Sequence, residues 1–138
     1  MDKTRAFMRT LSAIVVLFFA IGLQGQEGLV QERYPNGKLR NTQYVEGDLV
    51  RFVTYYESGR VKEMGGFRDG LRDGAWKQYA ENGTVLCEAL FDNGKRQGNW
   101  IVRNTANATT GRLHFTDGTL AYAEQLNAEG ELIAERTY

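Results

Sequence analysis

The sequence predicts an all-β fold, a run of antiparallel hairpins built from tandem repeats. The first observation is a phrase of aromatic residues and glycines that recurs after about 24 residues, a period typical of repeat architectures. Phe67, Gly70, Gly74 and Trp76 superimpose without a gap on Phe91, Gly94, Gly98 and Trp100. The second is a regular series of turn dipeptides, and the third is the β-branched and aromatic character of the segments between them.

Glycine marks the expected turns. Asn-Gly and Asp-Gly pairs favour tight turns, because glycine has no Cβ to clash at positive φ and Asn or Asp tolerates the left-handed region. Ten glycines are predicted to serve as structural turn residues: Gly37, Gly47, Gly59, Gly70, Gly74, Gly83, Gly94, Gly98, Gly118 and Gly130. They divide the chain into short segments of hairpin length.

The expected strands cover residues 49–56, 61–67, 85–91, 120–126 and 132–137. Val85, Cys87, Ala89 and Phe91 share one face at a spacing of two. No long stretch after residue 25 shows a helical apolar rhythm, so little helix is expected there. Residues 104–111 are small and polar and are predicted to form a loop.

The clearest repeats are 55–79 and 80–103, flanked by degenerate copies at 30–54 and 112–136. Shifting back one period aligns Tyr44 with Phe67 and Val53 with Trp76, and shifting forward aligns Phe115 with Phe91. Degenerate end copies are expected where an array faces solvent. An unbroken strand would send Trp76 and Tyr79 to opposite faces, so a bulge or a turn beginning at Tyr79 is needed to bring them together.

The N-terminal residues 1–25 are predicted to be a cleavable signal peptide. A basic stretch precedes an apolar run at 11–23, which is shorter than the roughly 20 residues that span a bilayer. Cleavage after Gly25 would leave a repeat domain of residues 26–138, exported to the periplasm, associated with the outer envelope or secreted. An uncleaved amphiphilic anchor is the alternative.

Charge and cysteine content limit the classes of partner. The chain has 17 basic and 17 acidic residues, and cleavage after Gly25 would leave 14 basic and 16 acidic residues, a net charge of −2. Basic side chains such as Arg68 and Lys95 sit beside acidic ones, which does not suggest nucleic-acid binding. The single cysteine, Cys87, permits no intramolecular disulfide.

No catalytic, cofactor-binding or metal-binding residues are predicted. Cys87 and His114 could suggest thiol chemistry, but they lie in different copies, and Cys87 is expected to be a buried inert thiol on an apolar strand face. One histidine and one cysteine do not complete a zinc shell. Turn chemistry accounts for Asp69, Asp73, Asp92 and Asp117 better than calcium binding does.

Aromatic residues of the repeats are candidates for partner binding, because they give large contact area and dominate interaction hot spots. The candidates are Tyr55, Tyr56, Trp76, Tyr79 and Trp100. The alternative is that they form the hydrophobic core of a thin sheet. This alternative is favoured for Trp76 and Trp100, whereas the tyrosines are left open between the two roles.

The central phrase resembles the MORN repeat variant of bacterial proteins. That pattern is matched at Phe67, Gly70, Gly74, Trp76, Tyr79, Asn82 and Gly83, and the second copy has Arg103 where the tyrosine would be. The resemblance is strongest over residues 55–102. It implies an elongated, single-layer antiparallel β-meander with a binding or scaffolding role.

Two functions are expected from these observations. The first is an exported, non-enzymatic module that binds a protein or a cell-envelope polymer, with membrane lipid as the less favoured partner because the surface charge is mixed. The second follows from the resemblance, since many bacterial sequences with this variant repeat are labelled YwqK-type antitoxin components. It is an antitoxin or immunity protein that neutralises a partner toxin, which an export signal disfavours.

Overall fold

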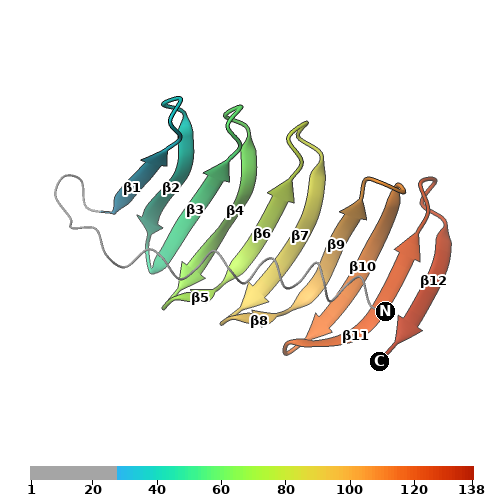
Figure 1. The fold of residues 1–138 in the computed structure, drawn as a ribbon. Helices are drawn as coiled ribbons and strands as arrows, with labels where there is room; N and C mark the ends of the chain where they lie inside the picture. Colours follow the sequence, from blue (N-terminus) through green and yellow to red (C-terminus); the bar gives the residue numbers. More distant parts are fainter. Residues whose placement is uncertain (1–27) are drawn as a thin grey trace.

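The computed structural model describes residues 28–138, and every regular element in that range is a β-strand (Figure 1). The strands are β1 (Leu29–Arg33), β2 (Leu39–Glu46), β3 (Leu49–Tyr55), β4 (Val61–Arg68), β5 (Leu71–Arg72), β6 (Gly74–Tyr79), β7 (Val85–Asp92), β8 (Lys95–Arg96), β9 (Gly98–Asn104), β10 (Thr109–Thr116), β11 (Thr119–Leu126) and β12 (Leu132–Thr137). The signal peptide predicted for residues 1–25 lies outside the described residues.

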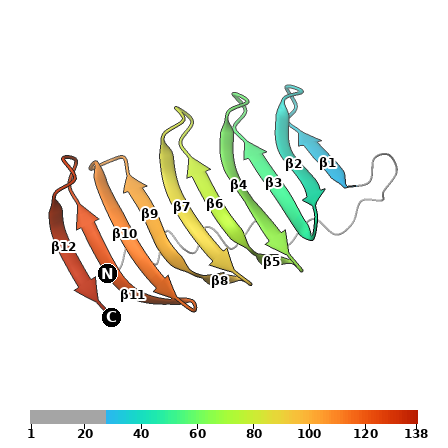
Figure 2. The ribbon, with the colours of Figure 1, turned by 180° about the vertical axis from the view of Figure 1, so that it is seen from behind.

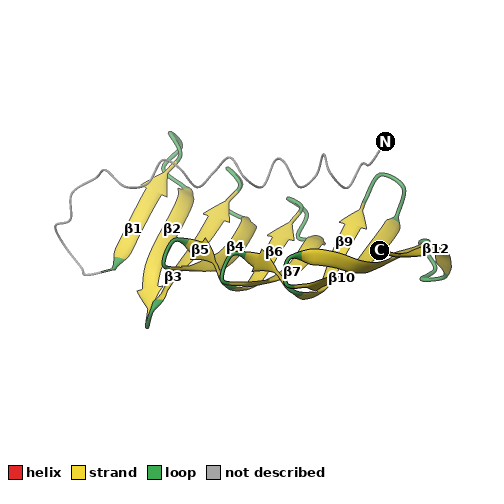
Figure 3. Cartoon of the chain, turned by 90° about the horizontal axis from the view of Figure 1, so that it is seen from below, coloured by secondary structure: helices red, strands yellow, loops and turns green. Residues whose placement is uncertain are grey.

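The strands form one antiparallel sheet in which neighbours in sequence are neighbours in space. The sheet has twelve strands in the order β1-β2-β3-β4-β6-β7-β9-β10-β11-β12, with β5 paired to β4 and β8 paired to β7. The view from behind (Figure 2) and the view from below (Figure 3) show these strands as a single twisted layer. The predicted all-β meander is therefore confirmed.

Four of the turns at the upper ends of the strands in Figure 1 repeat one hydrogen-bond pattern, and the turn between β9 and β10 differs. The amide of the first residue donates to the carbonyl four residues later, as in Tyr56 to Arg60 at 2.8 Å and Ala80 to Thr84 at 2.8 Å. A basic side chain then reaches the next turn, since Arg60 Nη1 donates to the carbonyl of Glu81 at 3.0 Å. Backbone groups that a turn would leave unpaired are satisfied within it or by its neighbour.

The lower turns are joined to each other in the same way. The Gly94 amide donates to the Arg72 carbonyl at 2.8 Å, and the Gly118 amide donates to the Arg96 carbonyl at 2.9 Å. Lys95 and Asp117 add an exposed ion pair at 2.7 Å between successive tips. All ten predicted turn glycines have positive φ, between +64° and +91°. The short strands β5 and β8 are the arms that carry two of these tips.

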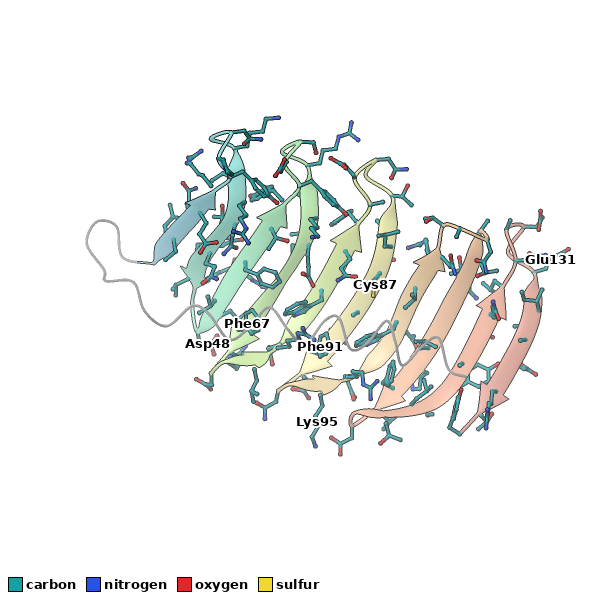
Figure 4. All side chains as sticks on the ribbon, viewed as in Figure 1. Asp48, Phe67, Cys87, Phe91, Lys95 and Glu131 are labelled. Atoms are coloured by element: carbon teal, nitrogen blue, oxygen red, sulfur yellow. The ribbon has the colours of Figure 1, made fainter. Side chains whose placement is uncertain are left out.

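One face of the sheet carries a continuous ladder of aromatic rings, and we call it the aromatic face. Its members are Phe52, Phe67, Trp76, Phe91, Trp100 and Phe115, and neighbouring ring centroids are 4.8 to 5.6 Å apart. Figure 4 shows Phe67 and Phe91 in the lower half of the sheet, on β4 and β7, the two strands that flank β6. These tilted and edge-on contacts are the arrangements that aromatic pairs prefer. The ladder is the hydrophobic core.

Guanidinium groups lie over the rings of the ladder. The Arg72 Cζ is 4.5 Å from the ring centroid of Trp76, and the Arg96 Cζ is 4.6 Å from that of Phe115. Each arginine belongs to a short arm, β5 or β8, so the arm brings a cation over the core. Cation–π attraction and packing of the arginine stem both stabilise this arrangement.

The observed strands agree closely with the predicted segments, but the register corrects three expectations. The predicted equivalence of Val53 with Trp76 is wrong by one residue. Phe52 is the residue that packs against Trp76, at a centroid distance of 4.8 Å. The β2–β3 hairpin pairs Glu46 with Leu49 and continues without a bulge, so it lacks the extra arm residues of the later hairpins.

The other two corrections concern the upper turns. The loop predicted over residues 104–111 is shorter, because β9 continues to Asn104 and β10 begins at Thr109. The bulge near Tyr79 lies in the partner strand β7, where the register shifts between Gln78 and Tyr79. Tyr79 is not brought beside Trp76, and its hydroxyl donates to the Met64 sulfur at 3.7 Å on the opposite face of the sheet.

Candidate binding surface

The face opposite the aromatic ladder carries a mixture of polar, apolar and charged side chains, and we call it the charged face. Strand register places one row of residues side by side across the whole sheet. The row runs Gln31, Thr42, Val53, Met64, Lys77, Glu88, Ile101, Arg112, Glu124 and Glu135. Because side chains alternate between faces along a strand, this row is separate from the aromatic ladder.

Ion pairs between neighbouring strands cross this face. Glu88 lies 3.2 Å from Lys77 and 3.6 Å from Arg103, and Arg112 lies 3.8 Å from Glu124. The partners are partly exposed, so each pair contributes little to stability. Their main effect is to leave a surface without a continuous patch of one sign.

A shallow hollow of about 500 Å³ lies over β9, β10 and β11. Its lining includes Asn99, Ile101, Arg112, His114, Tyr122 and Glu124. His114 Nδ1 is 2.7 Å from Asn99 Oδ1, and the two residues lie opposite each other in the β9–β10 ladder. Hydrogen-bonding groups are therefore concentrated at the C-terminal end of the charged face.

Tyr122 is held by two carboxylates beside this hollow. Its hydroxyl donates to Glu135 Oε2 at 2.7 Å and lies 3.3 Å from Glu124 Oε1. The hydrogen bond to Glu135 raises the Tyr122 pKa to about 12. The phenol is therefore neutral at physiological pH and acts as a hydrogen-bond donor.

The five aromatic candidates from the sequence occupy different places. Trp76 and Trp100 lie in the core, each with only 5% of its surface exposed. Tyr55, Tyr56 and Tyr79 are partly buried near the upper turns. The Tyr56 hydroxyl donates to the Tyr79 carbonyl at 2.7 Å, so this side chain links successive repeats.

Of the residues that line the hollow, the sequence singled out only Trp100, as a partner-binding or core residue, and His114, as a possible partner of a thiol. The lining residues come from β9 of a clear repeat and from β10 and β11 of the degenerate C-terminal copy, and apart from Trp100 no motif marks them. Strand alternation was the available signal. His114 lies between Leu113 and Phe115, so a strand that buries Phe115 turns His114 to the other face.

Cys87 and His114 lie on opposite faces of the sheet. Cys87 is opposite Val102, which is opposite Gly111, and this row belongs to the aromatic face; His114 is three residues beyond Gly111 and points the other way. Burial raises the pKa of the Cys87 thiol to about 11. The two side chains therefore do not form a thiol–imidazole pair.

Some of the acidic residues lie in the turns. Asp69 and Asp117 adopt positive φ at hairpin tips. Within residues 28–138, the structure shows no group of three or more His, Cys, Asp or Glu side chains that could hold a metal ion. In the same range there is no helix long and apolar enough to cross a membrane.

Comparison with solved structures gives only a distant likeness. The crystal structure of TarM matches with a TM-score of 0.46 and 9% identity. A second structure, a point mutant of S. aureus TarM in complex with fondaparinux, α-GlcNAc-glycerol and UDP, matches with a TM-score of 0.47 and 9% identity. Each match covers 96% of this chain and 24% of the other, so this chain spans about a quarter of the proteins it matches. No curated protein matches the chain.

Two segments of the chain match a protein-family model. The model described as MORN repeat variant matches residues 26–46 and 72–93. The second match covers the β5 arm, the strand that carries Trp76, and β7, which are the parts that define the repeat in the structure. MORN repeats commonly mediate binding to proteins or membranes. The two matched segments are therefore similar to repeats of the MORN repeat variant.

Proposed function

We propose that the protein is an exported, non-enzymatic binding module whose charged face contacts another protein or a polymer of the cell envelope. The proposal rests on the different roles of the two faces of the sheet. The aromatic side chains are used in the core, whereas the opposite face presents the hollow over β9, β10 and β11 with exposed polar groups.

The chemistry of the hollow supports binding. Arg112 supplies donors, Glu124 and the Tyr122 hydroxyl oxygen supply acceptors, and Ile101 supplies an apolar contact. A binding site of this kind combines apolar surface with a few placed polar groups. Mixed charge favours a protein or a polar polymer over nucleic acid, which requires a continuous basic surface.

The fold suits a fixed recognition surface. Hydrogen bonds join the lower tip at Gly118 to that of β8, and the strands that line the hollow are paired along their length, so the hollow has a defined shape. A preorganised surface loses less conformational entropy on binding than a flexible one. Export rests on the signal-like residues of the N-terminal sequence, which precede the described residues.

Site-specific photo-crosslinking in cells tests this proposal. A photoreactive residue at His114 is expected to capture an envelope protein or polymer, and the same residue at Leu90 is the matched control. Leu90 is 40% exposed on the charged face and lies outside the lining of the hollow. Capture at His114 together with a processed N-terminus near Gln26 supports the proposal.

Two results would overturn it. One is the absence of any adduct from His114 and Tyr122 positions in cells that export the chain. The other is an adduct with a small toxin in the cytoplasm, with Met1 intact, which would favour the antitoxin alternative.

A further inference from the structure

Within residues 28–138 the sheet is open at both ends, and each end strand has a neighbour on one side only. β1 pairs with β2 and β12 pairs with β11, and the two strands lie at opposite ends of the molecule in Figure 1. Every residue of β12 is exposed, with Leu132 and Ile133 at 50% and 53%. Open edges present unpaired backbone groups that can pair with another chain.

The backbone hydrogen bonds at the two end strands show which backbone groups face outward. The Tyr138 amide donates to the Ala121 carbonyl at 3.0 Å, and the Val45 amide donates to the Gly28 carbonyl at 3.1 Å. Bonding direction alternates along an antiparallel strand. Glu135 and Thr137 of β12 therefore direct their amides and carbonyls away from the sheet. On β1, Leu29 and Gln31 do the same.

The direction of the end strands is also compatible. The main path contains ten strands in antiparallel alternation, so β1 and β12 run in opposite directions. A second copy placed beside the first by translation would therefore bring its β1 antiparallel to β12. We propose that β12 of one molecule pairs with β1 of the next, extending the sheet head to tail.

One register satisfies the backbone and continues the rows of both faces. Pairing Glu135 with Gln31 of the second copy joins two ends of the same charged-face row. Ala134 then lies opposite Glu32, which belongs to the same aromatic-face row. The outward groups of Thr137 and Leu29 also meet in this register.

Charges are complementary across this junction. Glu135 would lie diagonal to Arg33 on the charged face, and Arg136 would lie diagonal to Glu32 on the aromatic face. Diagonal neighbours are within reach of long side chains, and opposite charges in such pairs are favourable. Full-length pairing of β12 with β12 would instead put Glu135 opposite its own copy. Like charges directly opposite are unfavourable, so pairing of unlike edges is preferred.

Association is tested first with the purified protein by sedimentation velocity over a concentration series. Head-to-tail pairing does not close, so species larger than a dimer are expected to grow with concentration. Glu135→Pro removes an outward amide without removing a bond to β11, and proline is tolerated at such edge positions. This variant is expected to remain monomeric, whereas Glu135→Ala, which keeps the amide, retains association that is only weakened.

A disulfide tests the register. In a Cys87→Ser background, Ala134→Cys combined with Glu32→Cys would face each other in a non-hydrogen-bonded pair, whose spacing suits a disulfide. Oxidation is expected to give a ladder of dimers, trimers and longer species on a non-reducing denaturing gel. Ala134→Cys combined with Val30→Cys is the control, offset by two residues, and is expected to give little ladder.

Each other outcome would overturn the proposal. These outcomes are a monomer at every concentration, a closed dimer that does not extend, association unaffected by Glu135→Pro, or an equal ladder from the offset control. The test uses the purified protein without any envelope component, so its failure leaves the proposed function standing.

Discussion

The central repeats and the C-terminal repeat fill the space between neighbouring strands with side chains of different size. Residues 65, 89 and 113 occupy equivalent places in three successive repeats and are glycine, alanine and leucine. The strand that follows each of them faces them with Trp76, Trp100 and Ala123 in turn, and Leu113 also lies opposite Trp100 of the preceding strand. On the side of the following strand, the facing residue is tryptophan opposite glycine and alanine, and alanine opposite leucine.

The geometry explains this exchange. A Cβ added at Gly65 would lie 2.5 Å from Cδ2 and Cε2 of the Trp76 indole, so the ring occupies the space of a side chain at residue 65. The indole Nε1 also donates to the Gly66 carbonyl at 3.2 Å, and Trp100 repeats this bond to Leu90 at 3.0 Å. In the C-terminal repeat, Leu113 fills the space itself. The combined volume of a facing pair matters more than the identity of either member.

Removal of the large member should have the largest effect in the central repeats. Trp76→Ala is expected to lower the free energy of unfolding by about 3–5 kcal/mol, because it removes the ring that packs against Phe52, Phe67 and Phe91. Leu113→Ala is expected to cost less, since Leu113 is only partly buried. Urea unfolding followed by circular dichroism measures both. Equal losses would contradict the ranking.

Addition of a methyl group to the small member should be the next largest effect. Gly65→Ala is expected to cost about 1–3 kcal/mol, because the new Cβ overlaps the indole. Gly111→Ala is the matched control, since the nearest atom to a Cβ there is 3.7 Å away and the backbone is not left-handed. That control is expected to be neutral or slightly stabilising in the same urea experiment.

The pair can be tested as a unit with a double-mutant cycle. Gly65→Ala in a Trp76→Leu background is expected to cost less than Gly65→Ala alone, because the smaller side chain leaves space for the methyl group. Additive losses would show that the cost of Gly65→Ala comes from the strand backbone and not from the indole.

The same comparison shows how far the sequence could predict the fold. Turn glycines and strands 61–67 and 85–91 were predictable, since turn chemistry and alternation are local signals. The facing of Gly65 and Trp76 was not, because it depends on register between β4 and β6. The misplacement of Val53 for Phe52 has the same origin: the β2–β3 hairpin lacks the arm that the later repeats insert.

The candidate surface was harder to predict for a related reason. His114 and Tyr122 come together only because β10 and β11 pair with a bulge between His114 and Phe115. The tryptophans were more prominent in the sequence, but the fold uses them in the core. A repeat motif reports the residues that packing requires, and a binding surface lies where packing leaves the side chains unconstrained.

The repeats also differ in charge at the position two residues earlier on the same strands. Residues 63, 87 and 111 are equivalent and are Glu63, Cys87 and Gly111. Burial raises the pKa of Glu63 above 4.5, although the hydrogen bond from Gln78 opposes this shift. Since the folded protein then binds the proton more tightly, the stability contribution of Glu63 is present below pH 4.5 and is lost as pH rises through the folded pKa.

Glu63→Gln should therefore stabilise the protein at neutral pH. The amide oxygen can still accept the bond from Gln78, while the cost of burying a charge is removed. Thermal unfolding at pH 7 is expected to show a higher midpoint than the parent, and the advantage should disappear below pH 4.5. Glu88→Gln, on the charged face, is the control and is expected to show no such gain. An advantage that persists at low pH would contradict the charge argument.

Changes at Cys87 are expected to affect stability least, but the reactivity of its thiol can be measured directly. Its pKa of about 11, against about 8.5 for an ordinary thiol, lowers the thiolate fraction at pH 7 by roughly two orders of magnitude. Alkylation of the native protein by iodoacetamide is therefore expected to be at least that much slower than alkylation in urea, because the thiolate is the nucleophile and Cys87 is also buried. The rate should rise about tenfold per pH unit up to the folded pKa.

Gly111→Cys in a Cys87→Ser background places a thiol at the equivalent, more exposed position and should react much faster. Equal rates at the two positions would mean that the C-terminal repeat buries this row as fully as the central ones, and the comparison between the repeats would then hold for volume alone.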